Sequence, residues 1–508
     1  MKVGMFFYII SLFISFWSRK VFLNHLGADF IGLTSTLNDI LSFLNVAELG
    51  IGTSITYFLY KPLQEQNREK INEIMSVLAY LYRKIGEILA VAGLAISLIF
   101  PFIFKNANLD MILIFFTFYV LLLQSVCGYI FNYKSLMLAA NQQQYITSTY
   151  LQTIYIIQNI VQIILAYTFS NLYVWTITGL IFTLIGLFVL NKRIDQHFPW
   201  LKTNLKRGKE MLQEYPEILS KTKQIFIHKI KNFLLYRSDQ IFIFAFVNLK
   251  MVAFYGNYML IINKVNYLVN IISDGMSAGV GNLVAEGDDK NTMKVFWELT
   301  AIRFLITGMI IFVFLLFLQP FITCWLGKEY HLDDIIIYLI LFNLFIMLSR
   351  GVVEIYIGAY GLFSDVWAAW VELALNIIFT VILGYAYGIA GIVAAKIISV
   401  FFIAMFWKPY FLFTRGLKKS VWVYWKGMSG YYILFVIFLT ITIFLKHYFT
   451  DSITDFPHLI LYGICITIPL TILYFLTMFI STNGLKYFVV RQPNLYKALS
   501  KIIPKNMR

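Results

Sequence analysis

The sequence predicts an all-α integral membrane protein with about fourteen transmembrane helices, arranged as two six-helix lobes followed by two further helices. Of its 508 residues, 60% are hydrophobic and only 13% are charged, and the mean hydropathy is +0.75. These values lie outside the range of soluble domains. Apolar runs of about 20 residues, the length that crosses a bilayer as a helix, follow one another along nearly the whole chain.

The first six helices make up a predicted N-lobe, residues 1–191. The run at 3–18 ends in Trp17, Ser18, Arg19 and Lys20 without a small-x-small cleavage pattern. We therefore expect a retained first helix that ends before Arg19. The next five helices of this lobe are expected at 31–59, 77–104, 111–133, 146–168 and 172–191.

A basic segment at 192–231 follows, with ten Lys and Arg, and it predicts a cytoplasmic linker between the lobes. The C-lobe, residues 232–413, is expected to contain helices at 232–248, 251–278, 296–318, 334–358, 366–387 and 389–413. Residues 414–508 are expected to form helices at 428–447 and 457–480 and a basic cytoplasmic tail. An even number of crossings places both termini in the cytoplasm, where the predicted loops hold about four times as many Lys and Arg as the outside loops.

A weak internal repeat supports the two lobes. The segment LQEQNREKINEI follows the helix at 31–59, and VAEGDDKNTMKV follows the helix at 251–278, which is its counterpart six helices later. Both segments are acidic and then basic, and both are cytoplasmic in the predicted topology. Such a repeat is typical of transporters built from two related halves, and it predicts lobes that face one another across a central cavity.

Two predicted helices carry continuous polar stripes at helical spacing. One stripe contains Thr34, Asn38, Ser42, Asn45, Glu48 and Gly52, and the other contains Asn263, Asn266, Asn270, Asp274, Ser277 and Gly281. Shorter stripes are Ser11, Ser15 and Ser18 in the first helix, and Ser148, Gln152, Tyr155, Asn159 and Gln162 in the fifth. A lone Asn or Ser usually holds two helices together, at under about 1 kcal/mol for each hydrogen bond. Stripes of this length instead favour the wall of a water-filled cavity.

Ionisable residues inside the predicted spans indicate what this cavity binds, because each charge near the bilayer centre must be compensated. Arg19, Arg237, Lys264 and Lys396 together would attract an anion such as a phosphate. Asp39, Glu48, Asp239 and Asp274 either neutralise these bases or couple transport to H⁺ or Na⁺, and the sequence leaves both roles open. We expect Arg350 and Glu354 to pair at i, i+4 spacing. Arg303 and Glu372 are expected to extend from helix ends toward water.

Other classes of site are not expected. The three cysteines and six histidines are scattered without the spacing of metal ligands, so neither a metal site nor a cofactor is predicted. We find no Walker, kinase or Ser-His-Asp pattern, which argues against ATP-driven transport and against an enzyme. Because the basic residues are explained by topology, the net charge of +15 does not indicate nucleic-acid binding.

Several segments resemble a known family. SRKVFLNHLGADFIGL, NVAELGIGTSITYFLYKPLQEQNREKI, RSDQIFIFAFV, FYGNYMLIINKVN and SAGVGNLVAEG are similar to the polysaccharide biosynthesis transporters, the Wzx-type branch of the multidrug/oligosaccharidyl-lipid/polysaccharide (MOP) flippase superfamily. The resemblance implies alternating access that moves a polyprenyl-pyrophosphate-linked oligosaccharide from the cytoplasmic to the periplasmic leaflet of the bacterial inner membrane. It also implies that Arg19, Arg237 and Lys264 contact the pyrophosphate, and that a polysaccharide polymerase and chain-length machinery are further partners beside membrane lipids.

Two alternatives remain open. A cation-coupled multidrug exporter of the same superfamily would be favoured by a net acidic cavity with its Arg and Lys on the surface. A membrane-embedded glycan polymerase, ligase or glycosyltransferase generally needs a large outside loop, whereas the longest one predicted here is 319–333.

Overall fold

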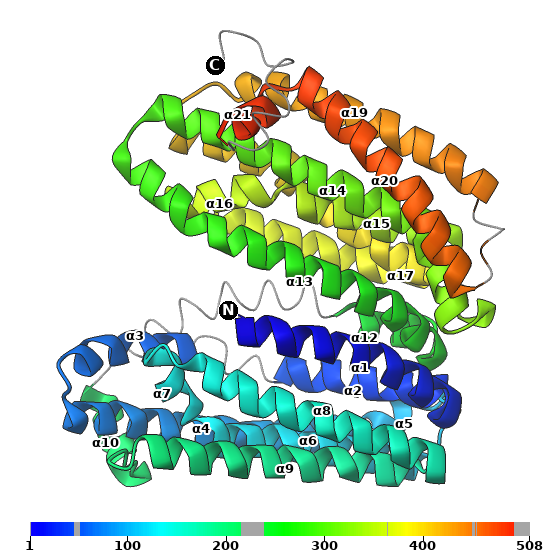
Figure 1. The fold of residues 1–508 in the computed structure, drawn as a ribbon. Helices are drawn as coiled ribbons and strands as arrows, with labels where there is room; N and C mark the ends of the chain where they lie inside the picture. The colour runs from blue at the N-terminus through cyan, green and yellow to red at the C-terminus, as the bar shows by residue number, and fades with distance from the viewer. Residues whose placement is uncertain are drawn as a thin grey trace. The chain divides into compact units, whose positions relative to one another are not determined.

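The computed structural model describes residues 2–44, 51–214, 238–362, 364–449, 453 and 455–491 (Figure 1). Within these ranges the regular structure is entirely helical, with no strand, which confirms the predicted all-α membrane fold. Eight helical segments in this part of the chain are long and apolar enough to cross a bilayer, with 366–416 counted as one. The total of fourteen spans stays a prediction.

The longer helices follow the predicted order. In the first half they are α1 (Lys2–Leu26), α2 (Ala28–Leu44), α3 (Ile51–Gln64), α4 (Arg68–Ser97), α6 (Met111–Asn132), α8 (Gln144–Phe169), α9 (Leu172–His197) and α10 (Leu205–Glu214), with short α5 (Phe100–Ile103) and α7 (Ser135–Ala140). Next come α12 (Asp239–Phe246), α13 (Leu249–Glu286), α14 (Asp289–Trp325), α15 (Asp334–Ser349), α16 (Gly351–Ala359), α17 (Val366–Phe402), α19 (Val421–Phe449), α20 (Phe456–Ser481) and α21 (Asn483–Arg491). Short helical turns at Lys328–Tyr330, Ile403–Trp407, Lys408–Phe411 and Leu412–Gly416 complete the set.

The chain divides into two compact units, residues 1–256 and 257–508. The division falls inside α13, whose first eight residues therefore belong to unit 1. The sequence instead placed the boundary between the lobes at the linker 192–231, and residues 215–237 lie outside the described part of the chain. The predicted extents of the lobes and the linker stay predictions.

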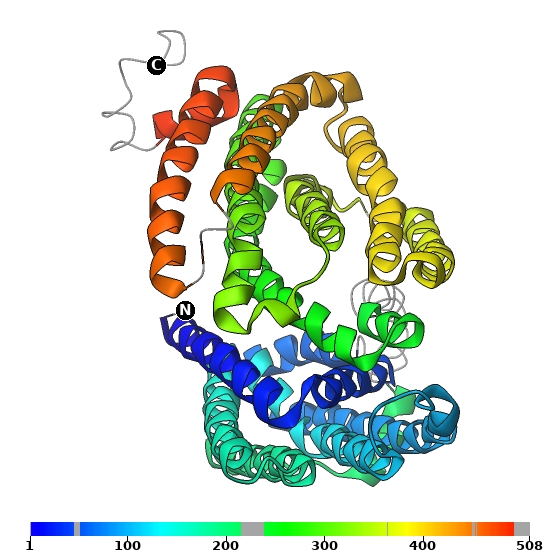
Figure 2. The ribbon, with the colours of Figure 1, turned by 90° about the vertical axis from the view of Figure 1, so that its right-hand side faces the viewer.

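Unit 1 is a helix bundle in which each long helix packs on its neighbours. Helix α1 lies against α8 and α2, α8 against α9, α9 against α6, and α6 against α4 (Figures 1 and 2). At one end, α3 and α7 cover α4 and α9, and they enclose an apolar core that includes Leu59, Met75, Leu138 and Leu190. Polar side chains held within this unit are therefore fixed by several helices at once.

The described part of the predicted linker is folded onto α4. The amide N–H of Lys202 donates to Asn72 Oδ1 at 3.0 Å, and that of Asn204 donates to Ser76 Oγ at 3.0 Å. Helix α10 then runs along α4, where Arg207 Nη2 lies 2.6 Å from Glu73 Oε1. A Cβ atom at Gly208 would overlap the backbone carbonyl of Ser76, so glycine allows this close approach. The first half of the basic segment is thus part of unit 1.

Unit 2 is built around α14, which contacts α15, α19, α20 and α21 (Figure 2). Aromatic rings fill the contacts because this part of the chain is rich in Phe and Tyr. The ring of Phe312 lies 5.6 Å from that of Phe435 and 5.2 Å from that of Tyr474. The short α21 packs on α14. Arg491 of α21 holds it there, with its Nη1 3.3 Å from Oε2 of the buried Glu298 on α14.

The segment drawn as α17 is a pair of helices, as predicted from the spans 366–387 and 389–413. Gly388 breaks the helix with φ +56° and ψ −132°. The two arms then run back along each other. Asn376 Nδ2 on the first arm donates to Ser399 Oγ on the second at 3.4 Å. A Cβ atom at Gly391 would overlap the carbonyl oxygen of Leu383, so only glycine fits this reversal.

The predicted end of the first helix is wrong. Helix α1 continues through Arg19 and Lys20 to Leu26, and a turn at Gly27, with φ +85°, leads directly into α2. Arg19 therefore lies within a helix that packs against the bundle, and not in an outside loop. The predicted helix at 31–59 is covered by α2 and α3, on either side of residues 45–50, which lie outside the described residues.

Helix packing at Gly32 gives a test of the unit 1 fold. A Cβ atom at Gly32 would overlap the carbonyl oxygen of Leu249, which is backbone and cannot rotate away. We expect Gly32→Ala to destabilise the protein by about 1–3 kcal/mol, as overpacking does. Thermal unfolding of the purified protein in detergent measures the change.

The matched control is Gly128→Ala in α6, where nothing lies within 4 Å of the added Cβ. Its midpoint should stay level or rise slightly, because alanine favours a helix. Equal midpoints for the two variants would contradict the packing of α2 on the start of α13.

Candidate functional site

Polar side chains from four helices gather in unit 1. They are Arg19 on α1, Asp39 on α2, Asp239 at the start of α12, and Tyr255 on the first turns of α13. Asp39 and Asp239 are 8% and 9% exposed, so both carboxyl groups are removed from bulk solvent. The sequence predicted the three charged residues as candidates, and the structure places all three in the same unit.

Arg19 is held against the start of α13. Its Nη2 donates to the carbonyl oxygen of Ala253 at 2.9 Å, and it lies 3.1 Å from where a Cβ of Gly256 would be. The absence of a side chain at Gly256 makes room for the guanidinium group. Since a guanidinium group stays protonated in proteins, this places a permanent positive charge beside α13.

Asp239 and Asp39 share the neighbourhood of one phenol. The hydroxyl of the buried Tyr255 donates to Asp239 Oδ2 at 2.9 Å, and Asp39 lies within electrostatic range of the same phenol. The phenol of Tyr255 therefore links the first turns of α13 to the acidic start of α12.

Other members of the stripes in unit 1 bond within their own helices. The hydroxyl of Ser15 donates to the carbonyl of Ser11 at 2.6 Å, and that of Ser18 to the carbonyl of Ser15 at 3.3 Å. Asn38 Nδ2 likewise donates to the carbonyl of Thr34 at 2.8 Å, although the residue itself is exposed. These bonds lie within single helices, so they neither join two helices, as the helix-contact interpretation expects, nor require a cavity.

The stripe on α8 contains both buried and exposed side chains. Asn159 is buried and its Nδ2 donates to the carbonyl of Tyr155 at 2.8 Å, whereas Gln152 is exposed. Gln162 Nε2 donates across to the carbonyl of Trp175 on α9 at 3.0 Å, so it links two helices of the bundle. Side chains of Gln124 and Gln158 also reach Gly179 on α9. Sequence periodicity identified Gln162 but not Gln124, which approaches Gly179 from another helix, α6.

In unit 2 the second stripe lies on α13. Asn263 and Asn270 are exposed, while Asn266 and Lys264 are half-buried. The side chain of Asp274 lies outside the described residues, as do Asn45, Glu48 and Arg237. The predicted convergence of Arg19, Arg237 and Lys264 on one anion therefore stays a prediction.

Three ionisable residues of the predicted spans in unit 2 are buried. Lys396 is 6% exposed on the second arm of the α17 pair, and Glu372 is 2% exposed on the first arm. Arg303 is 9% exposed, and its Nε donates to the carbonyl of Leu348 at 2.6 Å. The expectation that Arg303 and Glu372 extend toward water is therefore wrong, since their contacts are inside the unit. The predicted pair is confirmed, with Arg350 Nε 3.2 Å from Glu354 Oε1.

Comparison with known proteins identifies the fold of the chain. No family model matches the chain, and no curated protein matches it in sequence. Among solved structures, the lipid II flippase MurJ in an inward closed conformation matches with a TM-score of 0.63 and 13% identity, over 94% of this chain and 99% of the flippase. The chain has the fold of MOP-superfamily transporters. An inward-facing multidrug resistance MATE family transporter of that superfamily matches with a TM-score of 0.54 and 12% identity, over 81% of this chain and 95% of the transporter.

The similar structures agree with the sequence at a coarse level. One is a flippase and the other a multidrug transporter, and at 12–13% identity they show that this chain shares their helical fold. Tyr255 and Gly256 were not singled out by sequence because the turn between α12 and α13 interrupts the helical register between Asp239 and Tyr255. No local pattern could have signalled this pair, because Tyr255 and Asp239 lie 16 residues apart on two helices.

The bond between Tyr255 and Asp239 can be tested directly. Tyr255→Phe removes the phenol that donates to a buried carboxylate, and we expect the free energy of unfolding to fall by about 1–3 kcal/mol. Chemical or thermal unfolding of the purified variant measures this change.

Tyr60→Phe serves as the matched control, because Tyr60 is 54% exposed. The double variant Tyr255→Phe with Asp239→Leu should recover part of the loss, since the unsatisfied acid is then removed. A Tyr255→Phe protein as stable as the control would show that the bond is absent.

Proposed function

We propose that this protein is a flippase that carries a polyprenyl-pyrophosphate-linked oligosaccharide across the bacterial cytoplasmic membrane by alternating access, with both termini in the cytoplasm. The observation that carries the proposal is the extent of the match to the lipid II flippase, which covers 94% of this chain, against 81% for the MATE transporter. The segments that resemble Wzx-type transporters support the same substrate class. The proposed glycan is a repeat unit of O-antigen, capsule or exopolysaccharide.

Four basic residues are proposed to bind the pyrophosphate. Arg19, Arg237 and Lys264 are the main candidates, and Lys396 is a further one. Arginine binds phosphate oxygens through paired N–H groups, and lysine binds them as a point charge. The fixed position of the Arg19 guanidinium beside Ala253 supports its part, because a preorganised donor loses less entropy on binding.

Amide and carboxyl groups are proposed to take the other two roles. Asn263, Asn266, Asn270 and Gln152 offer donors and acceptors that suit sugar hydroxyls. Asp39 and Asp239 are the best-supported candidates for H⁺ or Na⁺ coupling, since they lie close to one phenol in unit 1. A polysaccharide polymerase and chain-length machinery are proposed as partners that receive the exported glycan.

A cation-coupled multidrug exporter is the second candidate, and the similarity to a MATE transporter is the observation that favours it. The two functions differ in what the basic residues do. A flippase of a pyrophosphate-linked substrate needs its cations, whereas an exporter of cationic drugs depends on its carboxylates.

The test of the proposal removes cations in the cell. In a strain that lacks the native gene, Arg237→Ala and Lys264→Ala should each lower surface glycan by about tenfold, because each loses a charge-assisted contact with phosphate. Surface glycan is measured by glycan-specific labelling, and protein abundance by immunoblot.

Lys61→Ala is the control, since Lys61 has a side chain that is 84% exposed on α3. Unchanged glycan export by both variants at normal abundance would refute the cationic site. Loss of drug resistance with intact glycan export would favour the exporter.

A further inference from the structure

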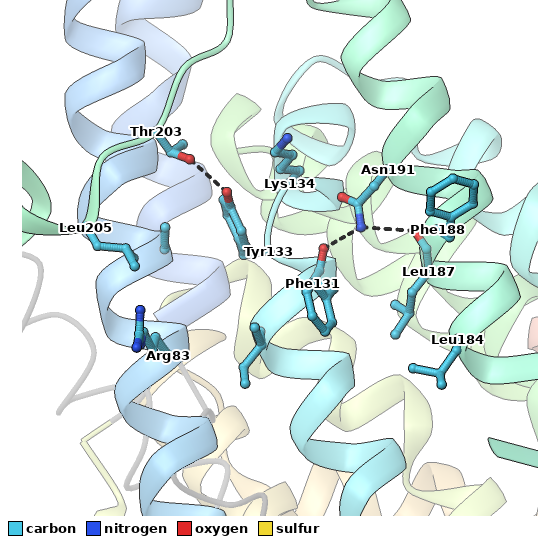
Figure 3. Close-up of a pocket in the computed structure, with 12 residues that line it drawn as sticks. Arg83, Phe131, Tyr133, Lys134, Leu184, Leu187, Phe188, Asn191, Thr203 and Leu205 are labelled. Atoms are coloured by element: carbon cyan, nitrogen blue, oxygen red, sulfur yellow. Dashed lines mark hydrogen bonds between the residues drawn. The ribbon is translucent and has the colours of Figure 1, made fainter. Parts of the chain in front are cut away.

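A groove of about 870 Å³ opens in unit 1 between the middle of α4, the C-terminal end of α6 and the second half of α9 (Figure 3). One side is formed by Arg83 of α4, and the other by Leu184 and Phe188 of α9. Lys134, just after α6, lies between them, and the chain that leads into α10 closes the end at Thr203 and Leu205. The volume falls within the range of about 300–1,000 Å³ that binds small ligands.

The groove has rigid polar walls. The hydroxyls of Tyr133 and Thr203 are 2.7 Å apart, which ties the end of α6 to the segment before α10. Asn191 Nδ2 donates to the carbonyl of Phe131 at 2.7 Å and joins α9 to α6, as Figure 3 shows. These bonds are made inside the protein and fix the three segments relative to one another. The space between them is therefore a feature of the fold.

Positive charge exceeds negative charge along the groove. Lys134 Nζ lies 2.6 Å from Asp195 Oδ1, and its side chain is only 20% exposed, so the ammonium group is fixed in place. Arg83 and its neighbour Lys84 share one carboxylate, that of Glu87, at 3.3 and 2.6 Å. Of these five groups only Arg83 and Lys134 line the groove, and its described lining includes no carboxylate. An anionic group in the groove would therefore face both cations.

The positive side chains of α4 lie in an unusual environment. The side chains of Arg83 and Lys84 are 57% and 51% exposed, yet both belong to the predicted span 77–104. Both residues lie within about two turns of the start of that predicted span, where long basic side chains extend to the phosphate layer of a membrane surface. Phe188, 70% exposed, and Leu184, 40% exposed, give the same groove an apolar side.

We propose that this groove binds one anionic phospholipid of the cytoplasmic leaflet, with its phosphate between Arg83 and Lys134 and an acyl chain along Leu184 and Phe188. Arginine and lysine are the residues that bind phosphate. A soluble phosphate compound would gain nothing from the apolar wall, and a zwitterionic lipid would leave the excess positive charge unbalanced. The site lies within unit 1 and is independent of the transported substrate.

The experiment measures lipid binding by the full-length protein, purified in detergent and titrated with phosphatidylglycerol or phosphatidylcholine. Native mass spectrometry counts the bound lipid. Wild type should bind one phosphatidylglycerol at least tenfold more tightly than phosphatidylcholine. Arg83→Gln with Lys134→Gln should lose this preference, and Leu184→Trp should weaken binding of phosphatidylglycerol by filling the apolar side.

Two controls separate the site from general surface charge. Lys61→Gln removes an exposed cation elsewhere in unit 1 and should bind as wild type does. Asp195→Asn frees Lys134 from its carboxylate and should bind phosphatidylglycerol at least as well as wild type.

Three results would overturn the proposal. They are equal affinity of wild type for both lipids, unchanged binding by the double variant, and full competition by glycerol phosphate, which would mean that the headgroup alone is recognised. None of these measurements depends on glycan transport, so a failure here leaves the proposed flippase function untouched.

Discussion

A polar group that enters a bilayer must find its partner inside the protein, because lipid tails offer no hydrogen bonds. The backbone and the buried charges of this protein both meet that requirement. Its described regular structure is helical, so backbone donors and acceptors satisfy one another locally. Where charges are buried, backbone carbonyls and phenols compensate them. Arg19 uses the carbonyl of Ala253, Arg303 uses that of Leu348, and Asp239 uses the phenol of Tyr255.

The same constraint separates structural polar groups from functional ones. Hydroxyls such as Ser15, and amides such as Asn159, bond to carbonyls four residues earlier and need nothing further. The carboxylates of Asp39 and Asp239 differ, because both are buried and lie near the phenol of one tyrosine on another helix. For this reason we propose these two acids, and not the longer amide stripes, for ion coupling.

Local signals in the sequence predicted most helices but not the contacts between them. The break between 366–387 and 389–413 was correctly placed because apolar length and Gly388 both mark it. The end of α1 was wrong because Arg19 is compensated by a carbonyl 234 residues away, which no local pattern can reveal. Arg303 was assigned to a helix end for the same reason. Similarly, Tyr255 escaped notice because its role depends on how the start of α13 folds back toward α12.

The central claim is that the protein moves a pyrophosphate-linked glycan lipid, and transport in a purified system tests it most directly. Proteoliposomes would contain the purified protein and a fluorescent polyprenyl-pyrophosphate oligosaccharide, with a membrane-impermeant quencher added outside. The account predicts that wild type accelerates exchange of the lipid between leaflets, and that Lys264→Ala, reconstituted in equal amount, abolishes the acceleration. Exchange no faster than in protein-free vesicles, together with ion-driven uptake of a cationic drug by the same preparation, would contradict the account.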